Sequence, residues 1–229
     1  MRSPIIIVVV GFFLFLLAPP QCSSFDLPGF KGIKPSPHSL SPPTEESTRL
    51  QVKEKLLSVS GEDFNVYTSS GSIAFTVVGS NKVPFGVGGL VLDKLVVRDS
   101  STSFVVSVER RLVSPNLCYD LYDEGGKFVG KIERNPFQPM RKEYCFCYGN
   151  DVYYKALGNF IERRYTFKDN NNNVVATVTR PLVELSEKMD EYEVKVEKGV
   201  DTAAIVGCVC VIDEDHDEEV QRRREEKKM

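Results

Sequence analysis

The amino-acid sequence predicts a mainly β fold of antiparallel hairpins, followed by one buried helix near the C-terminus. Between residues 50 and 196, short runs rich in Val, Ile, Thr, Tyr and Phe are separated by turns of Gly, Asn, Asp and Ser, which is typical of β-hairpins. From Ala203 to Ile212 every residue except Gly207 is apolar, and a helix that is apolar on all sides has to be buried. These two observations place the chain in the mainly β class.

The first 24 residues (1–24) predict a secretory signal peptide. A basic start at Arg2 precedes a run of 14 apolar residues from Ile5 to Ala18, and small residues suit a signal-peptidase site before Phe25. The apolar run is shorter than the roughly 20 residues that a membrane-spanning helix needs, so a cleaved leader is favoured over an uncleaved anchor. We therefore expect the chain to enter the secretory pathway, for secretion or for an endomembrane compartment.

Residues 25–48 predict a flexible Pro/Ser-rich linker, because the stretch 25–44 contains five prolines and shows no apolar periodicity. The alternative is a transit-like segment. The junction CSSF at 22–25, followed by a basic and acid-poor stretch, resembles the two-part plastid address of algae with complex plastids. In that alternative the final compartment is a complex plastid.

The body of the chain is predicted as a series of hairpins. Each hairpin pairs two apolar runs around a polar turn, and Gly, Asn, Asp or Ser stands where the backbone needs a positive φ. The predicted strands are residues 64–67, 73–78, 95–98, 104–110, 118–122, 128–133, 142–148, 152–157, 160–167, 174–179 and 192–196.

Three of these hairpins share one pattern, in which a strand ends in Asp, a polar turn follows, and the next strand ends in Arg. The three sequences are VVRDSSTSFVVSVER, DLYDEGGKFVGKIER and YTFKDNNNNVVATVTR, and they end at Arg110, Arg134 and Arg180. A repeat of one hairpin per unit is typical of a β-meander or a β-barrel.

The C-terminal apolar run is predicted as a helix near residues 201–212, although its Val and Ile content also suits a strand. Gly199 supplies a break, and Asp201 with Thr202 supplies an N-cap, which favours the helix. The residues predicted to fill the interior are Ala203, Ile205, Val206, Val209 and Val211. Residues 216–229 are predicted to form a solvated charged tail, helical or frayed.

Composition excludes several classes of function. The 229 residues carry a net charge of -3, so the basic excess of a dedicated nucleic-acid binder is missing. The two histidines, His38 and His216, lie outside the predicted hairpins, so imidazole catalysis and histidine metal sites have no core residue to use. The five cysteines after the leader are an odd number and cannot form a complete set of intrachain disulfides. We expect no enzyme activity, no cofactor and no metal.

Two patterns imitate metal sites without meeting their requirements. Cys145 and Cys147 share one face of a strand but lack further ligands nearby, so we interpret them as half-buried thiols. Acids alternate from Asp213 to Glu219 as in the first half of a calcium loop, but Glu218 and Arg224 stand where that loop needs Gly and Glu. The favoured interpretation of this acidic run is a solvated charge run.

Four stretches of the chain carry a family resemblance: LQVKEKLLSVSGEDFNVYTSSGSIAFTV (50–77), the hairpins within 95–132, FKDNNNNVVATVTR (167–180) and YEVKVEKGVDTAAIVGCVCVIDE (192–214). They resemble the LURP-one-related family, which is related to the tubby C-terminal domain and the phospholipid scramblases. The resemblance implies a closed, tubby C-terminal-like antiparallel β-barrel of about 12 strands over residues 49–215, threaded by the C-terminal helix. A closed barrel leaves no exposed strand edge, and a helix in its lumen has to be apolar on every side.

Basic residues gather around one predicted hairpin, and the candidate site residues there are Lys131, Arg134, Arg141 and Lys142. An antiparallel connection between the strands at 128–133 and 142–148 brings these cations toward one surface. The related tubby-like domains bind phosphoinositide head groups, so the resemblance implies an anionic phospholipid or a membrane surface as the partner. The competing interpretation is solvated charge scattered over the barrel.

We therefore predict a non-enzymatic, monomeric barrel module that binds phospholipid head groups or a membrane surface. The alternatives are a protein-interaction or structural barrel without a lipid ligand, whose partner the sequence does not identify, and a phospholipid scramblase-like lipid transfer that the resemblance implies. No nucleic-acid partner is expected at this net charge.

Overall fold

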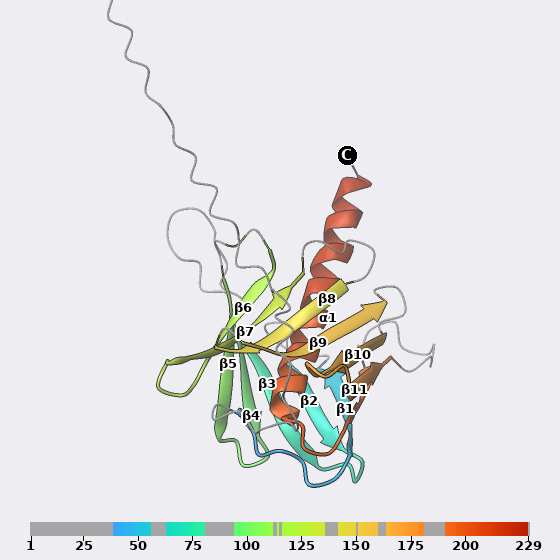
Figure 1. Ribbon diagram of the computed structural model, residues 1–229. Coiled ribbons are helices and arrows are strands. Elements are labelled where there is room, and N and C mark those ends of the chain that lie inside the picture. Colours follow the sequence, from blue (N-terminus) through green and yellow to red (C-terminus); the bar gives the residue numbers. More distant parts are fainter. Residues whose placement is uncertain are drawn as a thin grey trace, which may run out of the picture.

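The protein forms a closed β-barrel with one helix through its centre (Figure 1). In the computed structural model, the described residues are 39–55, 63–80, 94–111, 114, 116–135, 142–149, 151–159, 164–180 and 191–228. Twelve antiparallel strands follow one another around the barrel in sequence order, and the first strand closes on the last. This confirms the predicted barrel around a C-terminal helix. The predicted signal peptide and the first part of the predicted linker lie outside the described residues.

The strand bounds agree with the sequence prediction to within a few residues. The prediction includes the first strand only as part of the stretch 50–77, and the first residues of the predicted strand 160–167 lie outside the described residues. The strands are β1 (Thr48–Glu54), β2 (Phe64–Thr68), β3 (Ile73–Ser80), β4 (Lys94–Asp99), β5 (Phe104–Arg110), β6 (Cys118–Tyr122), β7 (Phe128–Arg134), β8 (Lys142–Tyr148), β9 (Asp151–Asn159), β10 (Arg164–Lys168), β11 (Val174–Thr179) and β12 (Glu191–Val196).

Four hairpins share one turn geometry, which explains the repeated pattern in the sequence. In each, the backbone N–H of the first turn residue donates to the carbonyl four residues later, and the residue three positions on has a positive φ. The turns begin at Thr68, Asp99, Asp123 and Asp169, and their positive-φ residues are Gly71, Thr102, Gly126 and Asn172. In the three turns that begin with Asp, the Asp carboxylate also accepts the N–H four residues on, at 2.8–2.9 Å. Asp recurs there because its short side chain satisfies turn donors.

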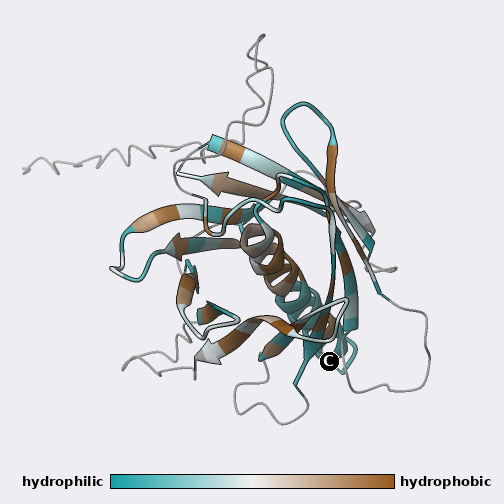
Figure 2. Cartoon of the chain, turned by 90° about the horizontal axis from the view of Figure 1, so that it is seen from below, coloured by the Kyte–Doolittle hydropathy of each residue, from teal (hydrophilic) through white to brown (hydrophobic). Residues whose placement is uncertain are grey.

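The helix α1 (Thr202–Glu226) fills the lumen with its first half (Figure 2). The five residues predicted to fill the interior, Ala203, Ile205, Val206, Val209 and Val211, are at most 3% exposed. Inward-facing strand side chains pack around them. The largest side chains that are fully buried include Tyr119, Leu121, Ile132, Tyr144, Phe146 and Phe167. The helix and the strands therefore bury one continuous apolar core.

The end of the barrel where α1 begins, here called the turn end, is covered by the segment 39–44. Asp201 caps the helix, and its buried carboxylate accepts hydrogen bonds from a first-turn N–H of α1 and from the Tyr148 hydroxyl of β8. The same carboxylate accepts the backbone N–H of Leu40 at 2.6 Å and the Ser41 hydroxyl at 2.6 Å. The sequence predicts a linker at this segment, and the structure packs its last part against the helix start.

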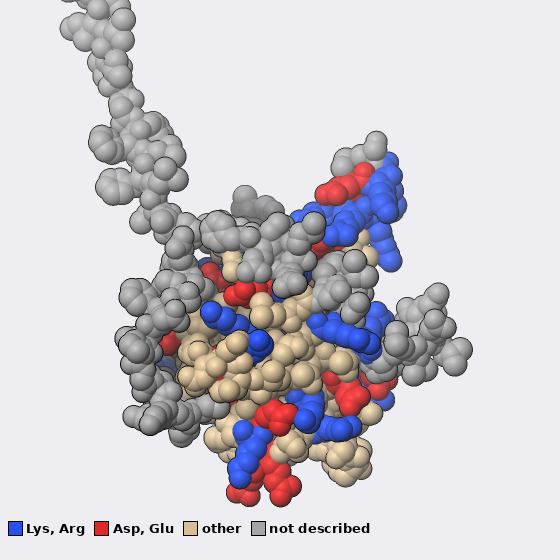
Figure 3. Space-filling model, turned by 45° about the vertical axis from the view of Figure 1, so that its right-hand side comes forward, with Lys and Arg blue, Asp and Glu red and all other residues tan. Residues whose placement is uncertain are grey.

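The helix continues well beyond the predicted range of 201–212. It ends at Glu226, so the predicted division between barrel and tail at residues 215 and 216 falls within one helix that projects from the barrel (Figures 1 and 3). The solvated charge run predicted after Ile212 is wrong for Asp213 and Asp215, which are about as buried as the core. Both carboxylates find hydroxyl or cationic partners on the strands. Within the described part of the chain, no helix is both long enough and apolar enough to span a bilayer.

The turn at Thr102 predicts a stabilising substitution. Thr102 has a φ of 66°, a left-handed conformation that disfavours a β-branched residue. We expect Thr102→Gly to raise the free energy of unfolding by about 1 kcal/mol, measured by urea denaturation. Ser101→Gly, in the same turn, is the matched control and should give no gain. Equal stability changes in the two variants would contradict the strain at Thr102.

The lumen predicts a severe defect for Gly207→Asp. A Cβ at Gly207 would lie 4.0 Å from a methyl group of Ile132 in the apolar lumen, so the added carboxylate is buried without a partner. We expect this variant to be unfolded at room temperature. Gly207→Ala is the control: it meets only ordinary contacts and should stabilise the helix by roughly 0.5–1 kcal/mol. Circular dichroism melting curves compare the two, and an unchanged curve for Gly207→Asp would place the residue outside the lumen.

Candidate binding pocket at the helix exit

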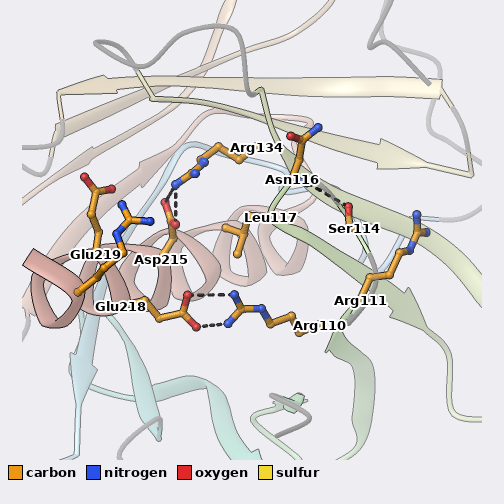
Figure 4. A pocket seen from close by; sticks show the side chains of 10 residues that line it. Arg110, Arg111, Ser114, Asn116, Leu117, Arg134, Asp215, Glu218 and Glu219 are labelled. Atoms are coloured by element: carbon orange, nitrogen blue, oxygen red, sulfur yellow. Dashed lines mark hydrogen bonds and ion pairs between the residues drawn. The ribbon is translucent and has the colours of Figure 1, made fainter. Parts of the chain in front are cut away.

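The opposite end of the barrel, here called the exit mouth, is where α1 leaves the lumen. The strands β5 and β7 both run toward this end, so their last residues, Arg110 and Arg134, lie beside the helix. Figure 4 shows these two arginines facing carboxylates of α1. They are two of the three strand-ending arginines that recur in the sequence pattern, so the repeat places cations at the helix exit.

Asp215 is the centre of the polar contacts at the exit mouth. Its carboxylate accepts hydrogen bonds from a guanidinium nitrogen of Arg134 at 2.8 Å, from the ammonium group of Lys142 at 2.7 Å, and from the Tyr144 hydroxyl. The side chains of Asp215 and Lys142 are both at least nine-tenths buried. A buried carboxylate is stable only with such partners, so this cluster ties α1 to β7 and β8.

The environment of Asp215 keeps the carboxylate charged. Burial raises its pKa, but hydrogen bonds from Lys142 and Tyr144, together with the charges of Lys142 and Arg134, outweigh burial, and the pKa lies below its ordinary value of 3.8. The pKa of Tyr144 is raised, first by burial and then by the charge of Asp215. Tyr144 therefore stays protonated and donates to the carboxylate.

Four polar residues of α1 form one stripe toward the barrel wall. Asp215, Glu218, Glu219 and Arg222 are spaced three, four and seven residues from the first, which places them on one helix face. The Glu218 carboxylate accepts two hydrogen bonds from the Arg110 guanidinium, one of them at 3.0 Å. Glu219 pairs with the ammonium group of Lys142 at 2.6 Å. The helix exit is therefore held by paired charges.

A pocket of about 380 Å³ opens between this stripe and the ends of the strands (Figure 4). It is polar, and arginine is its most frequent lining residue. The pocket is lined by Arg110, Arg111, Ser114, Asn116, Leu117, Arg134, Asp215, Glu218, Glu219 and Arg222. Arginine groups with hydroxyl and amide neighbours favour the binding of a small anionic or polyhydroxyl group.

Of the four cations that the sequence predicts as one site, the structure describes three, and it brings two of them together and separates the third. Arg134 and Lys142 meet at Asp215, and of these two only Arg134 lines the pocket. Lys131 lies on the outer face of β7, where it pairs with Glu133 at 2.7 Å. Arg141 lies outside the described residues. Each of the three described cations is thus paired with a carboxylate.

The pocket residues of α1 are not among the site residues that the sequence predicts. The acidic run suggested a period of two, from Asp213 to Glu219, which is the pattern of a calcium loop or a solvated tail. The spacing of three and four residues from Asp215 to Arg222 was the available signal, because it marks one face of a continuing helix.

The cysteines form no site among the described residues. Cys145 and Cys147, predicted as half-buried, are fully buried, and none of the five described cysteines forms a disulfide. Burial raises the pKa of Cys118 to about 11, so this thiol is unreactive at neutral pH. Within the described ranges, no three His, Cys, Asp or Glu side chains are grouped so that they could hold a metal ion.

The Asp215 cluster predicts a pH-dependent stability. A carboxyl whose pKa is lowered by folding stabilises the protein above its unfolded pKa, and this contribution is lost as the pH falls through the lower, folded pKa. We expect Asp215→Asn to lower the free energy of unfolding by about 3 kcal/mol at pH 7. The difference in the free energy of unfolding between parent and variant, here called the gap, should become smaller as the pH falls below 3.8, the ordinary pKa of the carboxyl group.

Urea denaturation at neutral pH and in acid measures this gap. Asp217→Asn removes a carboxylate from the exposed side of the same helix and should change the free energy of unfolding by less than about 0.5 kcal/mol. A gap between Asp215→Asn and the parent that stays constant from neutral pH into acid would show that the charge of Asp215 does not stabilise the fold.

Known proteins share this barrel. The chain matches the family described as LURP-one-related over residues 48–213, which confirms the resemblance in the sequence. A search of curated proteins gives no match. Among solved structures, the X-ray structure of an Arabidopsis thaliana protein is similar, with a TM-score of 0.54 and 18% identity over 77% of this chain and 96% of that chain, and this likeness shows a shared fold. Because the family match spans most of the chain, the protein belongs to the LURP-one-related family.

Proposed function

We propose that this barrel is a non-catalytic module that binds the anionic head group of a membrane phospholipid in the pocket at the exit mouth. The observation that carries the proposal is the pocket itself: a polar cavity of about 380 Å³ with four arginines on its wall. Arginine matches phosphate oxygens with paired N–H donors in a fixed plane, which makes it the favoured residue for phosphate recognition.

The carboxylates of the pocket do not oppose an anionic ligand strongly, because each already has cationic partners. Asp215 is neutralised by Arg134 and Lys142, and Glu218 by Arg110. These pairs hold Arg110 and Arg134 in place at the back of the pocket. A preorganised arginine loses little conformational entropy when an anion binds.

Two arginines of the pocket have partly exposed side chains suited to contact the ligand first, and one of them, Arg111, is oriented by two hydrogen bonds that its guanidinium donates to Asp120. The side chain of Arg111 is 43% exposed and that of Arg222 is 65% exposed. Ser114 and Asn116 add a hydroxyl and an amide to the same wall. A head group that combines phosphate with hydroxyls, such as a phosphoinositide, uses both kinds of donor.

Vesicle sedimentation tests the proposal on the chain that starts at Phe25. We expect stronger binding to phosphatidylcholine vesicles that contain a phosphoinositide than to vesicles of equal charge that contain phosphatidylserine. The double variant Arg111→Gln, Arg222→Gln should lose this head-group preference and bind phosphoinositide vesicles at least about tenfold more weakly. Thermal melting of each variant verifies that the barrel is folded.

The matched control is Lys127→Gln, Lys168→Gln, which removes two positive charges from hairpin turns at the turn end. It should bind as the parent does. The absence of any head-group preference in the parent, or equal losses in the control and the pocket variant, would remove head-group binding. The protein-interaction barrel would then be the better account, and transfer of labelled lipid between vesicles would test the scramblase-like alternative.

A further inference from the structure

The end of α1 and the two residues that follow it carry a group of cations that lie beyond the barrel. Beyond Glu219 the helix leaves the exit mouth and, at 1.5 Å per residue, residues 220–226 project over roughly 10 Å, followed by the turn residues Lys227 and Lys228. Figure 3 shows Lys and Arg atoms gathered on this projecting end. We define the basic tip as Arg223, Arg224, Lys227 and Lys228.

The basic tip occupies one side of the helix. At 100° per residue, Arg223 and Arg224 span an arc of about 100° on the last turn of α1, and the C-cap Lys227, which keeps helical backbone angles, falls within this arc. Glu225 and Glu226 lie outside this arc, and so does Arg222, which faces the pocket. Arg224 and Lys227 therefore lie on a different side of α1 from Arg222, whereas Arg223 pairs with the pocket residue Glu219.

The acidic part of the same helix neutralises little of this charge. Asp213, Asp215 and Glu218 turn toward partners on the strands. Within the tip, Arg223 pairs with Glu219 at 2.6 Å. The side chains of Arg224, Lys227 and Lys228 make no ion pair with any residue in the described part of the chain, and all three residues are exposed.

The spacing of the tip favours an external anion. Arg223 and Lys227 are four residues apart, and the C-cap Lys227 keeps helical backbone angles, so these two like charges are neighbours on one face. Such pairs destabilise a solvated helix. An anionic surface beside this face removes the repulsion and adds attraction.

We infer that the basic tip binds the surface of an anionic bilayer by charge alone and holds the exit mouth toward the membrane. The inference rests on the proposed function, to which it adds a second, independent contact. The projecting helix end extends beyond the described strands, and the pocket lies at the base of the same helix. The tip supplies attraction to any anionic lipid, and the pocket supplies the preference for a head group.

The test uses the triple variant Arg224→Gln, Lys227→Gln, Lys228→Gln of the chain from Phe25, and vesicles of phosphatidylcholine with phosphatidylserine. At about 1 kcal/mol for each cation near an anionic membrane, we expect the variant to bind on the order of 100-fold more weakly than the parent at low salt. Both proteins should converge at high salt because the attraction is screened. The triple variant Arg98→Gln, Lys127→Gln, Lys168→Gln, altered at the turn end, removes the same charge and should bind as the parent does.

The outcomes distinguish binding by the basic tip from binding in the pocket. A tip variant that binds weakly to phosphatidylserine vesicles but keeps the preference for phosphoinositide supports both sites. A tip variant that binds phosphatidylserine vesicles as tightly as the parent overturns the inference about the basic tip and leaves the proposed head-group binding in the pocket unaffected. A parent that binds no anionic vesicle overturns both. In a last measurement, a duplex oligonucleotide with a lower total charge than the vesicles is added to the parent bound to phosphatidylserine vesicles. Displacement of the parent would overturn the bilayer as the partner and indicate nucleic acid.

Discussion

An apolar helix inside a closed barrel is the constraint on which the rest of this structure depends. Twelve strands enclose a lumen wider than their own side chains fill, and residues 203–212 of α1 fill it. Carboxylates hold the helix at both ends of the lumen: Asp201 accepts the Tyr148 hydroxyl, and Asp213 accepts the Tyr192 hydroxyl. A carboxylate moved into the apolar lumen loses its partners, so the helix has one stable depth.

That fixed depth builds the exit mouth. Because the helix cannot slide, Asp215 meets Arg134 and Lys142 at the strand ends, and Glu218 meets Arg110. The paired charges stabilise the helix exit and at the same time orient the arginines of the pocket. Stability and the proposed binding thus depend on the same residues, whereas the basic tip projects free of the barrel and can change without loss of the fold.

The candidate site could be predicted only in part. Cations at strand ends are visible in the sequence, and Arg134 was selected among them. Lys142 meets Arg134 at Asp215, but Lys131 is separated from Arg134 because alternate residues of a strand face opposite sides: Lys131 points outward and pairs with Glu133, while Arg134 points inward to Asp215. The acidic pocket residues of α1 could not be predicted, because a charged run after an apolar helix is typical of a solvated segment unless the cations that neutralise it are known.

The sequence by itself determined the strands, the turns and the burial of the helix. The local signals are alternating apolar residues, the turn-forming Asp of the repeated hairpins, and the run from Ala203 to Ile212, which is apolar except at Gly207. Each depends on residues that are close together in the sequence. Tertiary structure alone decided how far the helix continues, that segment 39–44 packs against Asp201, and which charges pair. Those outcomes depend on groups far apart in the chain, such as Arg110 and Glu218, which meet only after the barrel closes around the helix.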